Sequence, residues 1–283
     1  MNTCIVCDST MEEGVVDWLK VCSNCRLRKA IAGIDNSEYE HKIGWNDDNA
    51  RALDSIRSSV ADKVISALEQ FNPLSGLQLL DVGCGPGWFL RAAAKRGAQV
   101  TGIEPDTRLA QAARDDGFAC HDGFFPDALP HNPFNIVVFN DVFEHIPDPT
   151  MAVKAIHQSL SDNGIVLVNL PVSDGIFYRT AELLGKFGIA FPLKRLWQCG
   201  YESPHLYYFN SANLTQLFER NGFERIYFGN LPSFDATGLW GRIREGDRIG
   251  VPATIASYLF IVALIPILRL MPADIGVVIY RKT

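Results

Sequence analysis

Positive charge is scarce in this sequence. Lys and Arg together number 26, whereas Asp and Glu number 32, so the formal net charge of the 283 residues is -6. Nucleic-acid phosphates are bound by basic faces, and this balance therefore argues against nucleic acid as a partner. Internal repeats and low-complexity segments are also missing. With 47% hydrophobic and 20% charged residues, the chain has enough apolar material for a sizeable core.

The N-terminus lacks the basic head and apolar stretch of a secretory signal peptide, so we expect a cytoplasmic protein. One charge-free stretch, residues 250–268, approaches membrane-spanning length, but Pro252 and Pro266 leave only a short helix between them. Two interpretations stay open: a buried core helix, and an interfacial helix that touches the inner face of the membrane. A spanning helix is disfavoured, because the last predicted strand has to return to the sheet.

Four of the seven cysteines form two C-x-x-C pairs, "CIVC" and "CSNC", separated by fourteen residues. In a cytosolic chain this arrangement indicates a metal site rather than disulfides. Four thiolates on two hairpin tips make a closed tetrahedral zinc site, which is structural and not catalytic. We predict a zinc ribbon over residues 1–30, with reduced and empty thiols as the alternative. The predicted zinc ligands are Cys4, Cys7, Cys22 and Cys25.

The rest of the chain predicts an α/β fold. Residues 31–76 form a helical linker, because apolar residues recur every three or four positions over 46–71. From residue 77 to 283 strands alternate with helices, which predicts a Rossmann-like, seven-stranded, mostly parallel sheet with helices on both faces. Two insertions interrupt this domain. Residues 231–272 are apolar, and residues 172–204, rich in aromatic and basic residues, are either a lid over the active site or a plain helical cap.

The stretch "LLDVGCGPGWFL" ends a predicted strand in a glycine-rich turn. Its spacing, G-x-G-x-G, differs from the dinucleotide pattern G-x-G-x-x-G, and no Lys-Ser or Lys-Thr follows as in a P-loop. Asp81 precedes the turn, and Glu104 ends the next strand at the separation typical of a ribose-binding acid. These features fit a phosphate-free ligand with a ribose and an amino group. S-adenosylmethionine (SAM) has both.

Two segments, "LLDVGCGPGWFLRAAAKRGAQVTGIEPD" and "FNIVVFNDVFEHIPDP", resemble class I SAM-dependent methyltransferases of the ubiquinone-biosynthesis and bacterial glycan-cluster type. The resemblance is strong from residue 78 to about 170. It implies a turn beneath the methionine part of SAM, an acid on the ribose, an aspartate facing the adenine, and two polar residues on the methionine side. The implied cofactor-binding residues are Asp81, Gly83, Cys84, Gly85, Gly87, Glu104, Pro105, Asp106, Asp122, Gly123, Asn140 and Asp141.

Methyl transfer to an oxygen needs alignment and a base. His145 in "FEHIPDP" and His205 in "YESPHLYYF" are the candidates, because histidine titrates near neutrality. For His145, a structural hydrogen bond near the cofactor is the alternative. We expect a methyltransferase that acts on a small-molecule or glycan acceptor. The favoured acceptor group is a sugar hydroxyl in a nucleotide- or lipid-linked glycan. The alternatives are a quinone-like phenol and a non-catalytic SAM-binding or zinc-ribbon scaffold.

Overall fold

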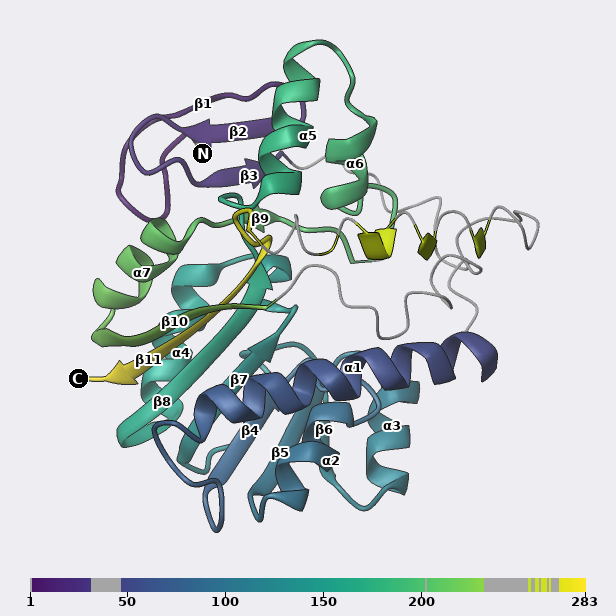
Figure 1. Ribbon diagram of the computed structural model, residues 1–283. Coiled ribbons are helices and arrows are strands. Elements are labelled where there is room, and N and C mark those ends of the chain that lie inside the picture. Colours follow the sequence, from purple (N-terminus) through teal and green to yellow (C-terminus); the bar gives the residue numbers. More distant parts are fainter. Residues whose placement is uncertain are drawn as a thin grey trace.

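The protein folds around two sheets. The computed structural model describes residues 2–31, 47–201, 203–231, 254–255, 258–259, 261–263, 265 and 270–283, with the backbone alone described for 47–56. In this part of the chain a seven-stranded sheet forms the centre, and a four-stranded sheet stands beyond one end of its strands (Figure 1). The C-terminus ends in the large sheet, whereas the N-terminus begins in the small one.

The large sheet confirms the predicted Rossmann-like fold. Its strand order is β10-β11-β8-β7-β4-β5-β6. β11 is antiparallel to β10 and β8, and the five strands from β8 to β6 are parallel to one another. The bounds are β4 (Gln78–Val82), β5 (Gln99–Glu104), β6 (Ala119–Asp122), β7 (Phe134–Asn140), β8 (Leu160–Pro171), β10 (Phe223–Leu231) and β11 (Ile275–Lys282).

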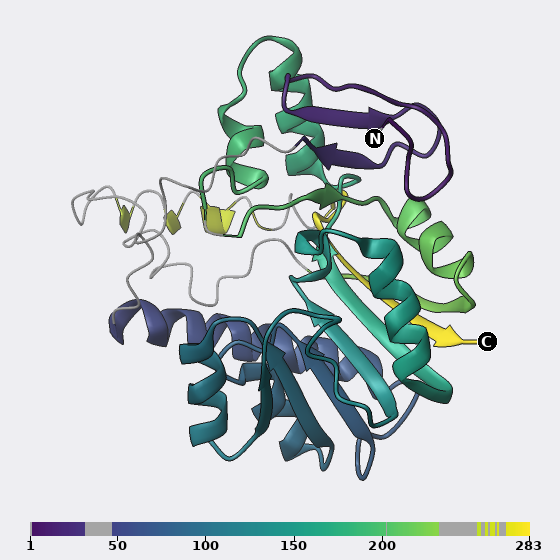
Figure 2. The same ribbon diagram turned by 180° about the vertical axis from the view of Figure 1, so that it is seen from behind.

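Helices cover both faces of this sheet, as the sequence predicts (Figure 2). Alternate strand residues explain this: Leu79, Val138 and Leu167 belong to a core with α1 (Asp47–Leu68) and α2 (Trp88–Lys95). Their neighbours Leu80, Val137 and Val168 belong to a second core with α4 (Pro149–Ser159) and α7 (Ser211–Glu219). α3 (Thr107–Asp115) packs beside β5 and β6. Because these strands are buried on both faces, their sequences are continuous apolar runs.

The sequence predicts helices that start after Asp106 and Asp148, and the structure confirms both starts. The Asp106 carboxylate accepts hydrogen bonds from the backbone at the start of α3, and Asp148 caps α4. The segment after Asp148 predicts a helix with Gly164 just past its end, but α4 ends at Ser159 and β8 begins at Leu160. Leu160 already pairs with β7, and Asn163 then takes a positive φ of 60° before the ladder resumes.

The N-terminal residues form the small sheet, in the order β1-β2-β3-β9. β1 (Met11–Glu13), β2 (Leu19–Cys22) and β3 (Arg28–Ala30) come from this segment, which we call the ribbon (residues 2–31). β9 (Tyr207–Tyr208) comes from the methyltransferase-like part and pairs antiparallel with β3. A two-residue strand is too short to show periodicity, so this pairing cannot be predicted from the sequence pattern.

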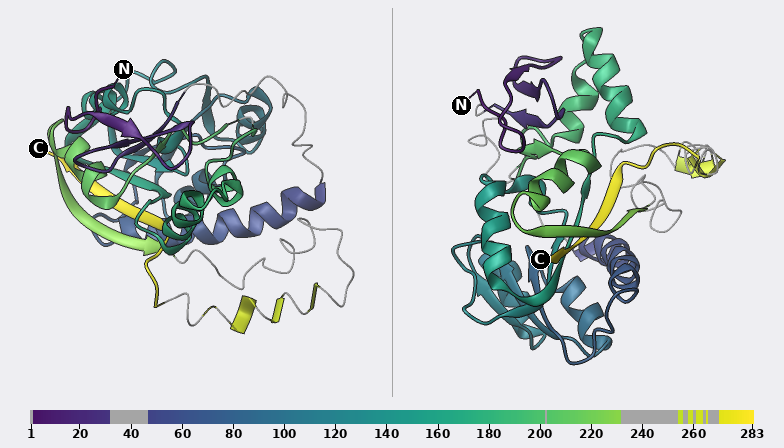
Figure 3. Two further views of the ribbon diagram at one scale, coloured as in Figure 1. Left: turned by 90° about the horizontal axis from the view of Figure 1, so that it is seen from above. Right: turned by 90° about the vertical axis from the view of Figure 1, so that its left-hand side faces the viewer.

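Residues 172–204 contain two helices, α5 (Ile176–Lys186) and α6 (Phe191–Leu196), which we call the lid. The lid rises above the large sheet and beside the ribbon (Figures 1 and 3). At its base the Asp274 carboxylate accepts hydrogen bonds from the backbone of Phe177 and Tyr178. Most of the apolar stretch 250–268 lies outside the described residues. None of the helices in the described part of the chain has the length and apolarity needed to cross a membrane.

Candidate active site and metal centre

A cavity of about 1600 Å³ opens at the carboxyl ends of β4, β5 and β7. This is where ligands bind in sheets of this type, because the loops after parallel strands meet there. The floor comes from Gly83, Glu104 and Asp141, and the lid forms the opposite wall with residues such as Phe177 and Phe191. The cavity thus joins the predicted cofactor residues to the predicted lid.

The glycine turn needs glycine for conformation and for space. Gly83, Gly85 and Gly87 all have positive φ, at 70°, 54° and 90°. A Cβ on Gly83 would lie 2.5 Å from Cγ2 of Val142, in the loop after β7. The turn therefore brings bare backbone to the edge of the cavity.

We expect Gly83→Ala to lower the stability of the protein by about 1–3 kcal/mol and to weaken SAM binding roughly tenfold, because both φ and the contact with Val142 are unfavourable. Thermal unfolding and calorimetric SAM titration measure the two effects. Gly83→Ala combined with Val142→Ala is the control, since it removes the clash and keeps the backbone strain. Wild-type affinity in the single variant would contradict this account of the turn.

Glu104 anchors the turn from the neighbouring strand. Its side chain accepts hydrogen bonds from the backbone N–H of Gly85 at 2.8 Å and of Asp106 at 3.0 Å. Burial raises the pKa of Glu104, and these backbone donors act in the opposite direction. Pro105 and Asp106 also border the cavity. A carboxylate held in this way presents acceptor lone pairs to the two hydroxyls of a ribose.

A smaller recess of about 140 Å³ extends from the turn toward α1 and is bordered by Asp81, Asn140 and Asp141. Asp81 is buried, and within the described part of the chain its Oδ1 has no hydrogen-bond partner. Burial raises the pKa of this carboxyl well above its usual range. An ammonium group in the recess would satisfy that oxygen and stabilise its charge. The orphaned carboxyl oxygen and the glycine cradle fit the amino-acid end of SAM.

Arg57 of α1 borders both the recess and the large cavity, a role that our sequence analysis missed. Its Nη1 lies 2.6 Å from Asp141 Oδ2. Asp141 adopts a positive φ of 54° and its backbone N–H donates to Asn169. Asn140 accepts a 3.4 Å hydrogen bond from the same asparagine. A guanidinium at this place suits the carboxylate of the methionine part.

Of the two residues predicted beside the adenine, Asp122 and Gly123, only Gly123 borders the cavity. Gly123 borders the cavity with Phe124 and Phe125, which our sequence analysis did not single out. Asp122 is not part of the cavity wall, and its carboxylate lies 3.1 Å from Arg114. Cys84 is buried in the turn, with its Sγ 3.5 Å from Cys120 Sγ. The predicted contact of Asp122 with adenine stays a prediction.

The structure places the two candidate histidines on either side of one carboxyl group. Glu144 Oε1 lies 3.9 Å from His145 Nε2 and 3.8 Å from His205 Nε2. The Glu144 carboxyl is fully buried, without a hydrogen-bond partner among the described residues, and burial raises its pKa well above the usual range. Burial lowers the pKa of His145, and that of His205 to about 3. All three residues border the cavity, and their donor atoms lie within 4.8 Å of one another, close enough to share a proton or a cation.

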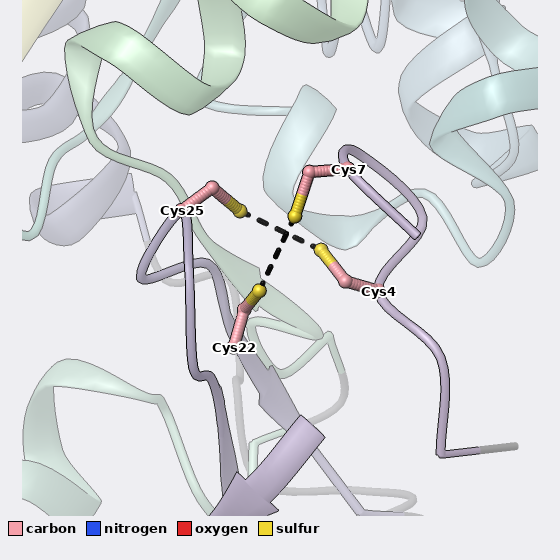
Figure 4. A group of neighbouring side chains, drawn as sticks. All are labelled: Cys4, Cys7, Cys22 and Cys25. Carbon is pink, nitrogen blue, oxygen red and sulfur yellow. Dashed lines mark hydrogen bonds between the residues drawn. The ribbon is translucent and has the colours of Figure 1, made fainter. Parts of the chain in front are cut away.

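The four ribbon cysteines converge from two loops. Their sulfur atoms lie within 4.8 Å of one another and point toward a common centre (Figure 4). Sγ of Cys4 is 3.5 Å from Cys25, and Sγ of Cys7 is 3.4 Å from Cys22. Tetrahedral zinc with Zn–S bonds of about 2.3 Å requires sulfurs roughly 3.8 Å apart. The donor set therefore fits zinc, and four thiolates would complete a tetrahedral, structural site.

We expect purified protein to hold about one zinc ion per chain, and Cys4→Ser with Cys25→Ser to hold almost none. Free energies near 10–16 kcal/mol have been associated with structural zinc in small domains, so the ribbon should lose its fold in that variant. Elemental analysis under reducing conditions gives the metal content. Cys199→Ser, outside the cluster, is the matched control. Wild-type protein without metal would contradict the assignment.

Comparison with known proteins agrees with this geometry. A family model described as "Methyltransferase domain" matches residues 53–227, which is more than half of the chain. The chain belongs to the class I SAM-dependent methyltransferases. The match extends from α1 to β10 and therefore includes the glycine turn, Glu104, Glu144, the two histidines and the lid.

Curated relatives cover part of this methyltransferase. A ubiquinone biosynthesis O-methyltransferase from Psychrobacter arcticus is 33% identical over 166 residues, which span 48% of this chain and 63% of that protein. Another from Pasteurella multocida is 29% identical over 115 residues, which span 35% of this chain and 48% of that protein. The chain thus spans about half the length of these relatives.

Solved structures share the fold at low sequence identity. A cyclopropane synthase from Mycobacterium tuberculosis superposes with a TM-score of 0.57 at 17% identity, and covers 78% of this chain and 83% of its own. A SAM-dependent methyltransferase from Mesorhizobium loti has a TM-score of 0.53 at 16% identity, and covers 77% of this chain and 96% of its own.

Proposed function

We propose that this protein transfers the methyl group of SAM to an oxygen of an acceptor bound in the large cavity. The observation that carries the proposal is that Glu104, fixed by two backbone N–H groups, borders the same cavity as Glu144, His145 and His205. SAM supplies an electrophilic methyl group on a sulfonium. The protein's part is to hold donor and acceptor in line and to remove the acceptor's proton.

His145 is the base in this proposal. Its Nδ1 donates a 2.9 Å hydrogen bond to the carbonyl oxygen of Pro204, so the ring proton sits on Nδ1 and Nε2 is the basic nitrogen. Its lowered pKa keeps the ring neutral near pH 7. Glu144 Oε1 lies 3.9 Å from His145 Nε2, close enough to orient the ring. His205 contacts the same carboxyl group and positions it.

A phenolic hydroxyl of a quinone-like compound is the acceptor that we favour. Relatives named as ubiquinone biosynthesis O-methyltransferases support it, as does the cavity wall formed by Phe177, Leu184 and Phe191 of the lid. Apolar and aromatic walls suit a planar ring with an apolar tail better than a polyhydroxylated sugar. A sugar hydroxyl is the second candidate, supported by the resemblance of residues 78 to about 170 to methyltransferases of bacterial glycan clusters.

The open cavity bears on the non-catalytic alternative. A scaffold without catalysis would need space for SAM alone, whereas the cavity of about 1600 Å³ extends from the SAM residues to the two histidines and the lid. Incubation with radiolabelled SAM and fractionated cell extract, followed by identification of the labelled product, tests the proposal. A labelled lipophilic phenol supports it, a labelled glycan favours the second candidate, and no label in any fraction overturns methyl transfer.

We also propose peripheral contact with the inner face of the membrane, in a cytoplasmic protein. Residues 250–268, where our sequence analysis put this contact, are mostly outside the described residues. The described lid offers further support: it exposes large apolar side chains among basic ones, in a chain with a net charge of -6. The exposed residues are Leu183, Phe187, Ile189 and Phe191 with Arg179, Lys186, Lys194 and Arg195.

The protein is expected to float with phosphatidylglycerol-containing vesicles, and Phe187→Ser with Ile189→Ser to lower the bound fraction roughly tenfold, because burying such side chains drives interfacial binding. Flotation with and without 0.5 M salt measures binding and its electrostatic part. Phe228→Ser, an exposed phenylalanine on β10, should have no effect. Failure of the wild-type protein to float would count against the membrane contact.

A further inference from the structure

The lid and the ribbon share one hydrophobic core. Ribbon residues Leu19 and Val21 are buried against Tyr178 of α5, Leu193 of α6 and Trp197, which follows α6. Trp18 of the ribbon meets Trp197 edge-on, with ring centroids 5.8 Å apart. This core is separate from the two cores of the large sheet. The apolar side chains of both lid helices that belong to this core are therefore buried only when the ribbon is folded beside them.

Arg28 of β3 makes the polar link between the same two parts. Its Nε and Nη2 donate to the two carboxylate oxygens of Glu182 on α5, both at 2.9 Å. Its Nη1 donates to Ser173 Oγ at 2.9 Å, and its guanidinium lies 4.9 Å from the ring centre of Tyr178. The arginine is 7% exposed. A bidentate pair of this kind fixes orientation as well as distance.

The ribbon is also connected through β9 to the group formed by Glu144, His145 and His205, which we call the catalytic cluster. Arg28 and Lys29 pair with Tyr208 and Tyr207 in the ladder between β3 and β9. His205 lies two residues before β9, and its backbone N–H donates to Trp197 O at 3.1 Å. Tyr208 Oη donates to Leu196 O, at the end of α6. The chain that carries His205 is thus held between the ribbon and the lid.

The cysteine cluster lies close to these links. Cys25 is three residues before Arg28, and its carbonyl oxygen accepts hydrogen bonds from the side-chain nitrogens of Asn210 and Asn213, both at 3.1 Å. The ribbon strands are three or four residues long. Strands this short do not form a stable fold in water by themselves, and zinc usually supplies the missing stability.

We propose that the ribbon, when it holds zinc, keeps the acceptor site in its binding conformation, a role that we call the brace. Arg28 is a positioning residue: it fixes α5 through Glu182 and, with the rest of β3, holds the segment that carries His205. Acceptor binding then depends on zinc, whereas SAM binding does not. The cofactor residues Asp81, Gly83 and Glu104 lie on the turn and strands of the large sheet. Glu104 is held by the turn itself, through Gly85 and Asp106, and the ribbon reaches this region only by apolar packing, where Val6 and Leu27 share a core with Val82 and Ile103 in the described residues. This inference deepens the proposed function and rests on it for the acceptor.

Hydrogen exchange on the full chain tests the brace. The variants are Cys4→Ser with Cys25→Ser, which removes the metal ligands, and Arg28→Gln, which removes the link to Glu182 and keeps the cluster. Lys20→Gln is the matched control, since Lys20 is a ribbon cation that pairs within the ribbon, with Glu13 at 3.2 Å. Zinc content, SAM affinity by calorimetry and exchange rates in α5, α6, α2 and α3 are measured for each protein.

We expect exchange in α5 and α6 to rise about 100-fold or more without the metal ligands and roughly tenfold in Arg28→Gln, since both open the lid locally. Exchange in α2 and α3 and the SAM affinity should stay within about threefold. Arg28→Gln should retain its zinc. Unchanged lid protection in both variants overturns the brace, as does equal loss of protection in α2, which would mean global unfolding.

Turnover separates this inference from the proposed function. With an extract fraction that accepts labelled methyl, Arg28→Gln should raise the apparent acceptor KM roughly tenfold and leave the SAM KM unchanged, and Arg28→Lys should recover part of the loss. A fall in kcat with both KM values unchanged would contradict the positioning role. If no fraction is methylated, the proposed function fails, and the exchange and SAM measurements still decide the brace.

Discussion

Replacement of Glu104 by alanine is expected to weaken SAM binding about 100-fold or more while the protein stays folded. The carboxylate is expected to accept both ribose hydroxyls, and charge-assisted hydrogen bonds of this kind contribute about 1.5–3 kcal/mol each. It also accepts the N–H groups of Gly85 and Asp106, so its loss frees the turn. Calorimetric titration with SAM measures the affinity, and circular dichroism checks the fold.

Two further variants sharpen this test. Glu104→Gln keeps one acceptor oxygen and should bind SAM with an affinity between those of wild type and Glu104→Ala. Asp122→Asn tests the predicted contact with adenine: the carboxylate pairs with Arg114 and is not part of the cavity wall, so a change in SAM affinity of less than about threefold would rule that contact out. Unchanged SAM affinity in Glu104→Ala would refute the cofactor site.

The second large effect is expected from His145→Gln, which should lower kcat by a factor of about 10²–10⁴ and leave SAM affinity unchanged. General bases typically contribute rate factors of this size. Glutamine can preserve hydrogen bonding at the position of the imidazole, but it cannot accept the acceptor's proton. Labelled methyl transfer in the active extract fraction measures the rate. Equal rates in variant and wild type would leave His145 with the structural role, its hydrogen bond to Pro204.

The pH dependence gives an independent check on the same base. A base acts only when it is neutral, and burial lowers the pKa of His145 below the usual 6.5. The wild-type kcat/KM should therefore stay level as the pH falls through 6.5 and decline only below it, as His145 becomes protonated. His145→Gln should abolish this decline. If the wild-type kcat/KM already falls above pH 7 as the pH is lowered, the decline would have to come from a group other than His145.

Much of the fold could be predicted from the sequence, because the information is local. Strands such as β7 and β8 are apolar throughout, and Asp106, Asp148 and Pro149 mark helix starts where the structure has them. The cofactor turn could be predicted from the glycine spacing and the position of Glu104, because these too are local features of the sequence. The end of α4 was wrong, because Leu160 gains a pairing with Phe134 across the sheet that no local pattern shows.

The catalytic cluster was predicted in part. His145 and His205 were identified by their place after predicted elements, but Glu144, which lies between them, was missed although it adjoins His145. A glutamate beside a histidine in sequence says nothing about burial. Arg57 was missed likewise, since an arginine on an amphipathic helix usually faces water, whereas here it borders both cavities.

By itself the sequence determined the Rossmann-like sheet, the turn expected to hold the methyl donor and a four-cysteine cluster, because strand periodicity, glycine geometry and ligand spacing are properties of short segments. Only the tertiary structure decided how these parts meet. The pairing of β3 with β9, the contact of Arg28 with Glu182 and the shared core around Trp197 join residues more than 150 positions apart. Such contacts form because buried charge and apolar surface need partners, whose place in the chain no local pattern encodes.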